Sequence, residues 1–154
     1  MKPSQFNKAY FLLIILSFFL LGLVDAQVGR AEDWQFVGER PGRGKIYVDK
    51  ESISRQPAGT LQYKAKIYVE GERKASMAKA IGIELKDPKK GQALDHVICE
   101  IEIDCATSQD KMLSIQFLDK SGKEILTKKE SEPFMAIGPD QLSQAIKAMV
   151  CGSK

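Results

Sequence analysis

The segment from His96 to Cys105 constrains the fold more than any other part of the sequence. Its apolar side chains and both of its cysteines alternate with its acids: Val97, Cys99, Ile101, Ile103 and Cys105 against Glu100, Glu102 and Asp104. Because successive side chains of a strand point to opposite faces, this pattern predicts a strand with one buried and one solvated face. Along such a strand Cys99 and Cys105 lie roughly 20 Å apart, far beyond the ~7 Å that a disulfide spans. These two cysteines therefore do not pair with each other.

The third cysteine, Cys151, is left to pair with one of the other two. Cys105 is the better partner because it ends the strand, where a bridge reaches the chain terminus without crossing the packed centre. Pairing with Cys99 is the alternative. If Cys105 is bridged, Cys99 stays a buried thiol, which usually behaves as a small apolar side chain. A disulfide requires an oxidising compartment, so this prediction depends on export.

The first residues of the chain predict that export. Residues 1–10 carry two lysines and no acid, and the uncharged apolar run Phe11–Val24 follows directly. At about fourteen residues this run is short for a membrane span, which needs about twenty. We therefore predict a signal peptide over residues 1–26, cleaved after Ala26 or, at a second site, after Ala31, with only transient membrane contact. An uncleaved anchor is the alternative, and with no cysteine near the junction a lipid anchor is not expected.

Removing residues 1–26 leaves a chain suited to one domain, residues 27–154. Its formal charge is +2, because Lys2, Lys8 and Asp25 are lost from 23 basic and 20 acidic residues. A formal charge this close to zero creates little electrostatic attraction for nucleic acid, so no nucleic-acid partner is expected. His96 is the only histidine, which excludes metal sites that need two histidines. No cofactor is expected.

Alternation and turn residues predict about six antiparallel strands and a terminal helix, an α+β fold. The predicted strands are 33–38, 45–49, 60–70, 96–105, 111–119 and 123–129. Residues 75–86 are interpreted as a helix that ends at the Asp87-Pro-Lys-Lys-Gly91 sequence. A second helix, Pro139–Val150, should pack one face on the sheet and end near Val150, so that Cys151 can turn toward its partner. Its apolar stripe is Leu142, Ala145, Ile146 and Met149.

No group of residues has the paired roles that catalysis needs, so the chain is not expected to be an enzyme. The alternating acids are typical of a solvated strand face, and neither cysteine chemistry nor a serine triad has the partners it requires. Basic residues fall in loops, where solvation explains them, although they could meet an anionic surface: Arg40, Arg43, Lys45, Lys86, Lys89 and Lys90. An apolar cleft between sheet and helix is a candidate binding site, against the alternative that its aromatic residues are core. Its candidate lining is Trp34, Phe36, Tyr47, Tyr63 and Phe134.

Short motifs in order along the chain resemble the surface-adhesin protein E family of exported bacterial proteins. They are Trp34, Tyr47-Val48-Asp49 with Ser52-Ile53, Glu102-Ile103-Asp104-Cys105, the Asp119-Lys-Ser-Gly122 turn, Ile137-Gly-Pro139 and Val150-Cys151. The resemblance spans about residues 34 to 151. It implies an antiparallel sheet whose carboxy-terminal helix is tethered by a disulfide, here Cys105–Cys151. This agrees with the pairing preferred from strand geometry.

The resemblance also implies a function. It is that of an exported, non-catalytic, adhesin-like binding domain of the cell envelope, located in the periplasm or at the cell surface. The expected partner is a macromolecule, either a host matrix protein or an envelope component, and a homodimer is left open. A periplasmic enzyme accessory or an envelope assembly factor is the alternative.

Overall fold

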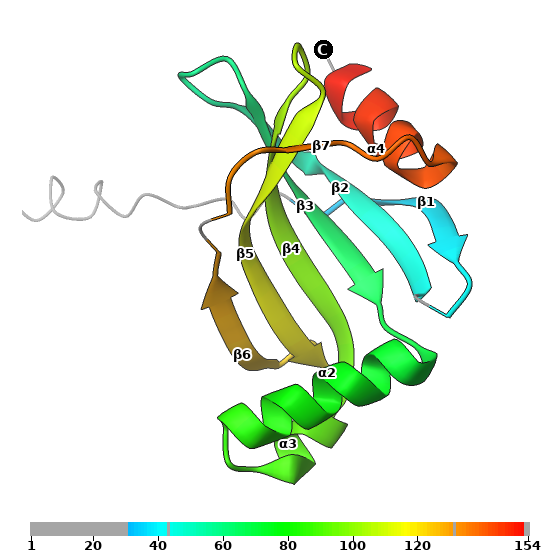
Figure 1. The fold of residues 1–154 in the computed structure, drawn as a ribbon, viewed down its shortest axis with the longest axis vertical. Helices are drawn as coiled ribbons and strands as arrows, with labels where there is room; N and C mark the ends of the chain where they lie inside the picture. Colours follow the sequence, from blue (N-terminus) through cyan, green and yellow to red (C-terminus); the bar gives the residue numbers. More distant parts are fainter. Residues whose placement is uncertain (1–30, 43, 131, 153–154) are drawn as a thin grey trace, which may run out of the picture. The chain divides into compact units, whose positions relative to one another are not determined.

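The computed structural model describes residues 31–42, 44–130 and 132–152, so the predicted signal peptide lies outside the described residues. Six strands follow one another across a single antiparallel sheet in chain order, and a short seventh strand pairs with β5 (Figure 1). This confirms the predicted α+β fold with its antiparallel sheet. The strands are β1 (Trp34–Arg40), β2 (Gly44–Arg55), β3 (Leu61–Tyr68), β4 (Leu94–Asp104), β5 (Gln109–Asp119), β6 (Glu124–Lys129) and β7 (Met135–Ala136).

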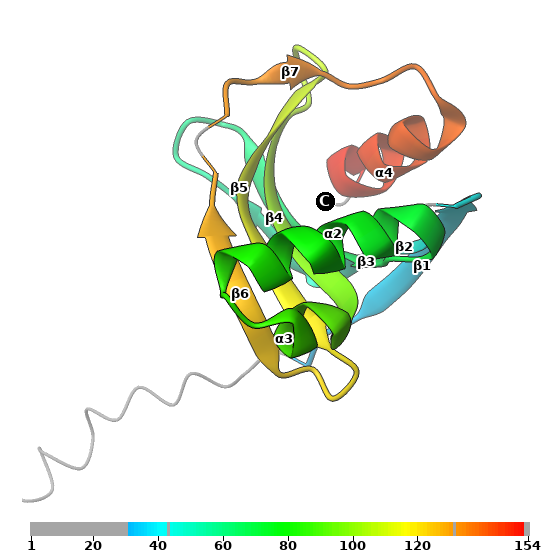
Figure 2. The same cartoon turned by 60° about the horizontal axis from the view of Figure 1, so that its bottom comes forward.

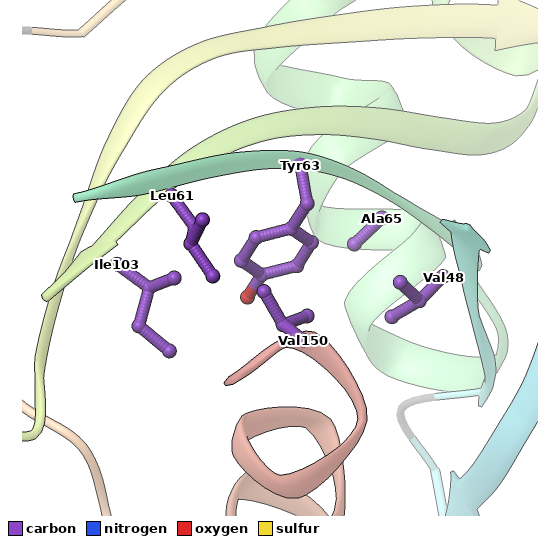
Figure 3. Packing of buried hydrophobic residues seen from close by; sticks show 6 residues of the cluster. All are labelled: Val48, Leu61, Tyr63, Ala65, Ile103 and Val150. Carbon is purple, nitrogen blue, oxygen red and sulfur yellow. The ribbon is translucent and has the colours of Figure 1, made fainter. Parts of the chain in front are cut away.

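Two helices, α2 (Gly71–Glu84) and α4 (Gln141–Gly152), pack on the concave face of the curled sheet (Figure 2). The short helix α3 (Pro88–Gln92) packs against α2. Beneath α2, Ile81 packs on the β4 face that carries Val97 and Cys99. Beneath α4, the fully buried Val150 packs against Val48, Leu61, Tyr63, Ala65 and Ile103 (Figure 3). In the described part of the chain, no helix packs on the opposite face, which we call the open face.

A disulfide joins Cys105 to Cys151, with 5.9 Å between their Cα atoms, as predicted. The expected end of the helix at Val150 is wrong, because α4 continues to Gly152. The buried direction of α4 is centred near Val150, and Leu142 lies at one flank above Gly38 of β1. Cys151 lies about 100° from Val150 around the helix and so reaches Cys105 from the other flank.

The segment between β3 and β4 folds into two helices where one was expected. α2 begins and ends earlier than the predicted 75–86, and the Asp87-Pro sequence opens α3. Asp87 accepts hydrogen bonds from the backbone N–H groups of Lys89 and Lys90, and Pro88 occupies the first helical position, where its missing N–H costs nothing. None of the described helices has the length and apolar character needed to cross a membrane.

Candidate binding face

The predicted aromatic residues lie on both faces of the sheet. Tyr63 points inward beneath α4 and is only 2% exposed, and burial raises the pKa of its phenol (Figure 3). Trp34 and Tyr47 lie on the open face, where they line one hollow. Phe134 lies below the ammonium of Lys111, a residue of β5, and three strands separate β5 from β1 in the sheet. The structure therefore brings Trp34 and Tyr47 to one hollow, with Phe36 beside Tyr47, but does not bring all five residues to one cleft.

A row of rings crosses the first four strands on the open face. We call Phe36, Tyr47, Tyr68 and His96 the aromatic row; adjacent ring centroids lie 5.3, 5.9 and 5.2 Å apart. These separations are those of favourable tilted and edge-to-face aromatic pairs. The row begins at Phe36, which is 56% exposed, and ends at the buried His96. The exposed end therefore offers apolar area to a partner, whereas the other end is fixed in the sheet.

Beside the row lies a hollow of about 360 Å³. It is lined by Trp34, Lys45, Tyr47, Lys66, Tyr68 and Glu70. The ammonium of Lys66 lies 4.0 Å from the centre of the Trp34 ring, a cation–π contact. Burial lowers the pKa of Lys66, although Glu32 and Asp49 oppose that shift. The hollow thus combines apolar rings with charges of both signs. This composition suits a partner surface that also carries both apolar and charged groups.

Asp49 holds the start of β1, and with it Trp34, against the sheet. The residue is 4% exposed, and its carboxylate accepts hydrogen bonds from the backbone N–H groups of Asp33, at 2.9 Å, and Glu51, at 3.2 Å. Trp34 donates its indole N–H to Glu32 at 2.7 Å. A buried carboxylate satisfied by backbone donors is a rigid support, so the rings of the hollow are fixed before any partner binds.

The acids farther along the open face form cross-strand contacts. Glu100 accepts a hydrogen bond from Gln62 at 2.6 Å. Glu102 accepts one from the Thr60 hydroxyl, also at 2.6 Å, and pairs with Lys111 at 2.9 Å. The Thr60 hydrogen bond is the largest of the causes that lower the pKa of Glu102. Both carboxylates connect neighbouring strands through their hydrogen bonds, which is a structural role.

His96 and Cys99, both in β4, lie on opposite faces of the sheet. His96 lies on the open face, with its Nδ1 atom 3.0 Å from the carboxylate of Asp95. Cys99 is buried on the concave face, where burial raises the pKa of its thiol to about 11. The described residues contain no group of three or more His, Cys, Asp or Glu side chains placed to hold a metal ion.

Three residues of the hollow were not identified from the sequence as binding residues: Lys66, Tyr68 and Glu70. All three lie on the polar side of the alternation in residues 60–70, the side on which solvated residues were expected. The missing information was the register, which sets Tyr47 opposite Lys66 and Tyr68 opposite His96. The signal available was weak, because only the occurrence of an aromatic residue among the polar positions of β3 distinguished Tyr68.

Comparison with known proteins assigns the fold to a family. The family model described as surface-adhesin protein E matches residues 34–152. The chain belongs to the surface-adhesin protein E family. No curated protein sequence matches this member of the family. The match confirms the predicted resemblance and supports the adhesin-like binding role and export toward the cell surface expected from it.

Two solved structures of Haemophilus influenzae protein E are similar to this member of the family. Crystal form II has 14% sequence identity and a TM-score of 0.46, and the match covers 79% of this chain and 96% of that one. The selenomethionine form has 18% identity and the same TM-score, with 79% of this chain and 92% of that one covered.

Proposed function

We propose that this domain is a non-catalytic adhesin module that binds an extracellular protein of the host matrix through the aromatic row and the adjoining hollow. The observation that carries this proposal is the arrangement of rings on a face that no described helix covers. Aromatic side chains at the centre of a protein interface, surrounded by charged residues, provide most of its binding energy. Here Tyr47 and Tyr68 form the centre, with Lys45 and Glu70 at its edge.

The fixed geometry of these rings also supports binding. Asp49 anchors the strand that carries Trp34, and Lys66 lies against the Trp34 ring. A surface ordered in advance loses little conformational entropy on association, so more of the contact energy is available as affinity. The proposed ligand contacts the exposed ring of Phe36 first and then the hollow beside it.

Export places this surface outside the cytosol. In this proposal residues 1–26 are a signal peptide, cleaved after Ala26, and residues 27–154 are released as the adhesin domain. The domain then acts at the cell surface by binding its ligand, without catalysing a reaction. Cell fractionation with protease treatment of intact cells tests the location: accessible protein agrees with the proposal, and protein protected inside the periplasm contradicts it.

The binding proposal is tested with purified extracellular-matrix glycoproteins immobilised on a sensor surface. Replacing Tyr47 and Tyr68 by serine should weaken binding by about 30-fold or more, the loss typical of residues at the centre of an interface. Gln116→Ala with Thr127→Ala is the matched control, because both residues lie on the same face of the sheet but on β5 and β6. Affinity unchanged by the tyrosine substitutions, or equally reduced by the control, would contradict the proposal.

A further inference from the structure

A second surface hollow lies on the helical segment between β3 and β4. It has a volume of about 630 Å³, and we call it the α2–α3 groove. Its lining is apolar apart from two lysines and a glutamine: Ala75, Ala78, Lys79, Gly82, Ile83, Lys86, Pro88 and Gln92. Ile83 is 69% exposed, the highest value among the exposed large hydrophobic residues of the described chain. With Ala75, Ala78 and Pro88 it forms a contiguous apolar lining, which makes the groove a candidate interaction surface.

Positive charge is concentrated around this groove. The segment 71–92 contains six lysines and arginines and three acids, a formal charge of +3, whereas residues 27–154 together carry +2. Two of those acids are engaged within the fold: Glu84 pairs with Lys128, and Asp87 caps α3. The groove therefore lies in a segment of net positive charge and has Lys79 and Lys86 in its own lining, a charge that complements an anionic partner.

The small residues of the groove are already used to pack α3 on α2. A Cβ atom on Gly91 would lie 2.1 Å from the backbone oxygen of Ala78, and one on Gly82 would lie 3.1 Å from the Cα atom of Pro88. A second helix would need those same positions for close approach. What stays exposed is Ile83 between Lys79 and Lys86, whose long apolar stems can lie along a hydrophobic layer while their ammonium groups reach its polar boundary.

We propose that the α2–α3 groove docks the domain on the surface of an anionic phospholipid membrane. Ile83 enters the boundary of the acyl chains, and Lys79 and Lys86 pair with lipid phosphates on either side of it. Lysines near an anionic bilayer and an inserted apolar side chain act together in this way in peripheral proteins. The groove is separate from the aromatic row, so membrane docking and ligand binding can be tested independently.

Vesicle flotation tests this proposal with the full chain, expressed in bacteria and purified after export. The probes are vesicles of phosphatidylcholine alone and vesicles of phosphatidylcholine with phosphatidylglycerol. The protein should float with the anionic vesicles only, and Lys79→Gln with Lys86→Gln should reduce partitioning about 30-fold. Ile83→Ser should reduce it about tenfold at any salt concentration, because that loss is not electrostatic.

Lys50→Gln with Arg55→Gln is the matched control, because it also removes two positive charges. Both residues belong to β2 and neither lines the α2–α3 groove. This variant should partition like the wild type. Equal binding to neutral vesicles, or equal loss in the control, would overturn the proposal. If the lysine variant still floated normally but no longer bound immobilised poly-L-glutamate, the partner would be an acidic protein and membrane docking would be refuted.

Discussion

Removing the Cys105–Cys151 disulfide should lower the free energy of unfolding by about 4 kcal/mol. The bridge closes a loop with a sequence separation of 46 residues, and loop-closure entropy for that length gives about 4 kcal/mol at 25 °C. With a urea m-value of about 2 kcal/mol/M for a domain of this size, the midpoint of unfolding should fall by about 2 M. The perturbation is Cys105→Ala with Cys151→Ala, and the assay is urea unfolding followed by circular dichroism.

Two controls separate the bridge from the loss of sulfur atoms. Wild-type protein in a reducing agent should unfold at the same urea concentration as the double variant, because both lack the covalent loop. Cys99→Ala removes a buried thiol without changing the bridge, so its cost should be only about 1 kcal/mol. A midpoint shift below about 0.5 M would refute the loop-closure argument. Peptide mapping of unreduced protein that found Cys99 joined to Cys151 would refute the register of β4.

Two further predictions concern backbone conformation and pH. Gly44→Ala should destabilise the fold much more than Gly59→Ala in urea unfolding: both glycines have positive φ, but only at Gly44 would a Cβ meet backbone, 1.6 Å from the Tyr68 oxygen. Equal losses would show that φ strain alone matters. Asp140 has its pKa lowered to about 2, first by the hydroxyl of Ser143 and also by Arg40. Its carboxylate therefore stabilises the folded state above about pH 4 and that contribution is lost toward pH 2, so Asp140→Asn should flatten this part of the stability curve.

The parts of the fold that follow a local period could be predicted from the sequence. Alternation in β3 and β4 identified the buried faces, because the side-chain direction of a strand repeats every two residues regardless of its neighbours. The disulfide pairing followed from the same two-residue period, because it placed Cys99 and Cys105 on one extended strand, too far apart to pair with each other. Short turns predicted that the strands from His96 onward form an antiparallel meander, as observed for β4, β5 and β6.

What could not be predicted depends on contacts between distant segments. The helix after β3 begins at Gly71 without a side-chain cap, so no local signal marked its start. The Asp87-Pro pair did mark the start of α3, but it was interpreted as the end of the preceding helix. The candidate cleft required knowledge of which sheet face the helices cover, and this decided that Tyr63 is core while Tyr47 lies on the open face. The hydrophobic pattern assigns a buried and a polar face to each strand, but it does not show which face of the sheet the helices cover.

The bridge also determines how the domain would respond to mechanical tension. A pull on the carboxy-terminal end passes through Cys151 directly to Cys105, at the end of β4, without passing along β5, β6 or β7. The residues inside the disulfide loop cannot be stretched out. At about 3.4 Å per residue over a separation of 46 residues, the bridge shortens the extended chain by about 160 Å. An adhesin held under fluid shear would therefore yield first in the strands before Cys105, while the covalent loop that contains β5 to β7 stays short.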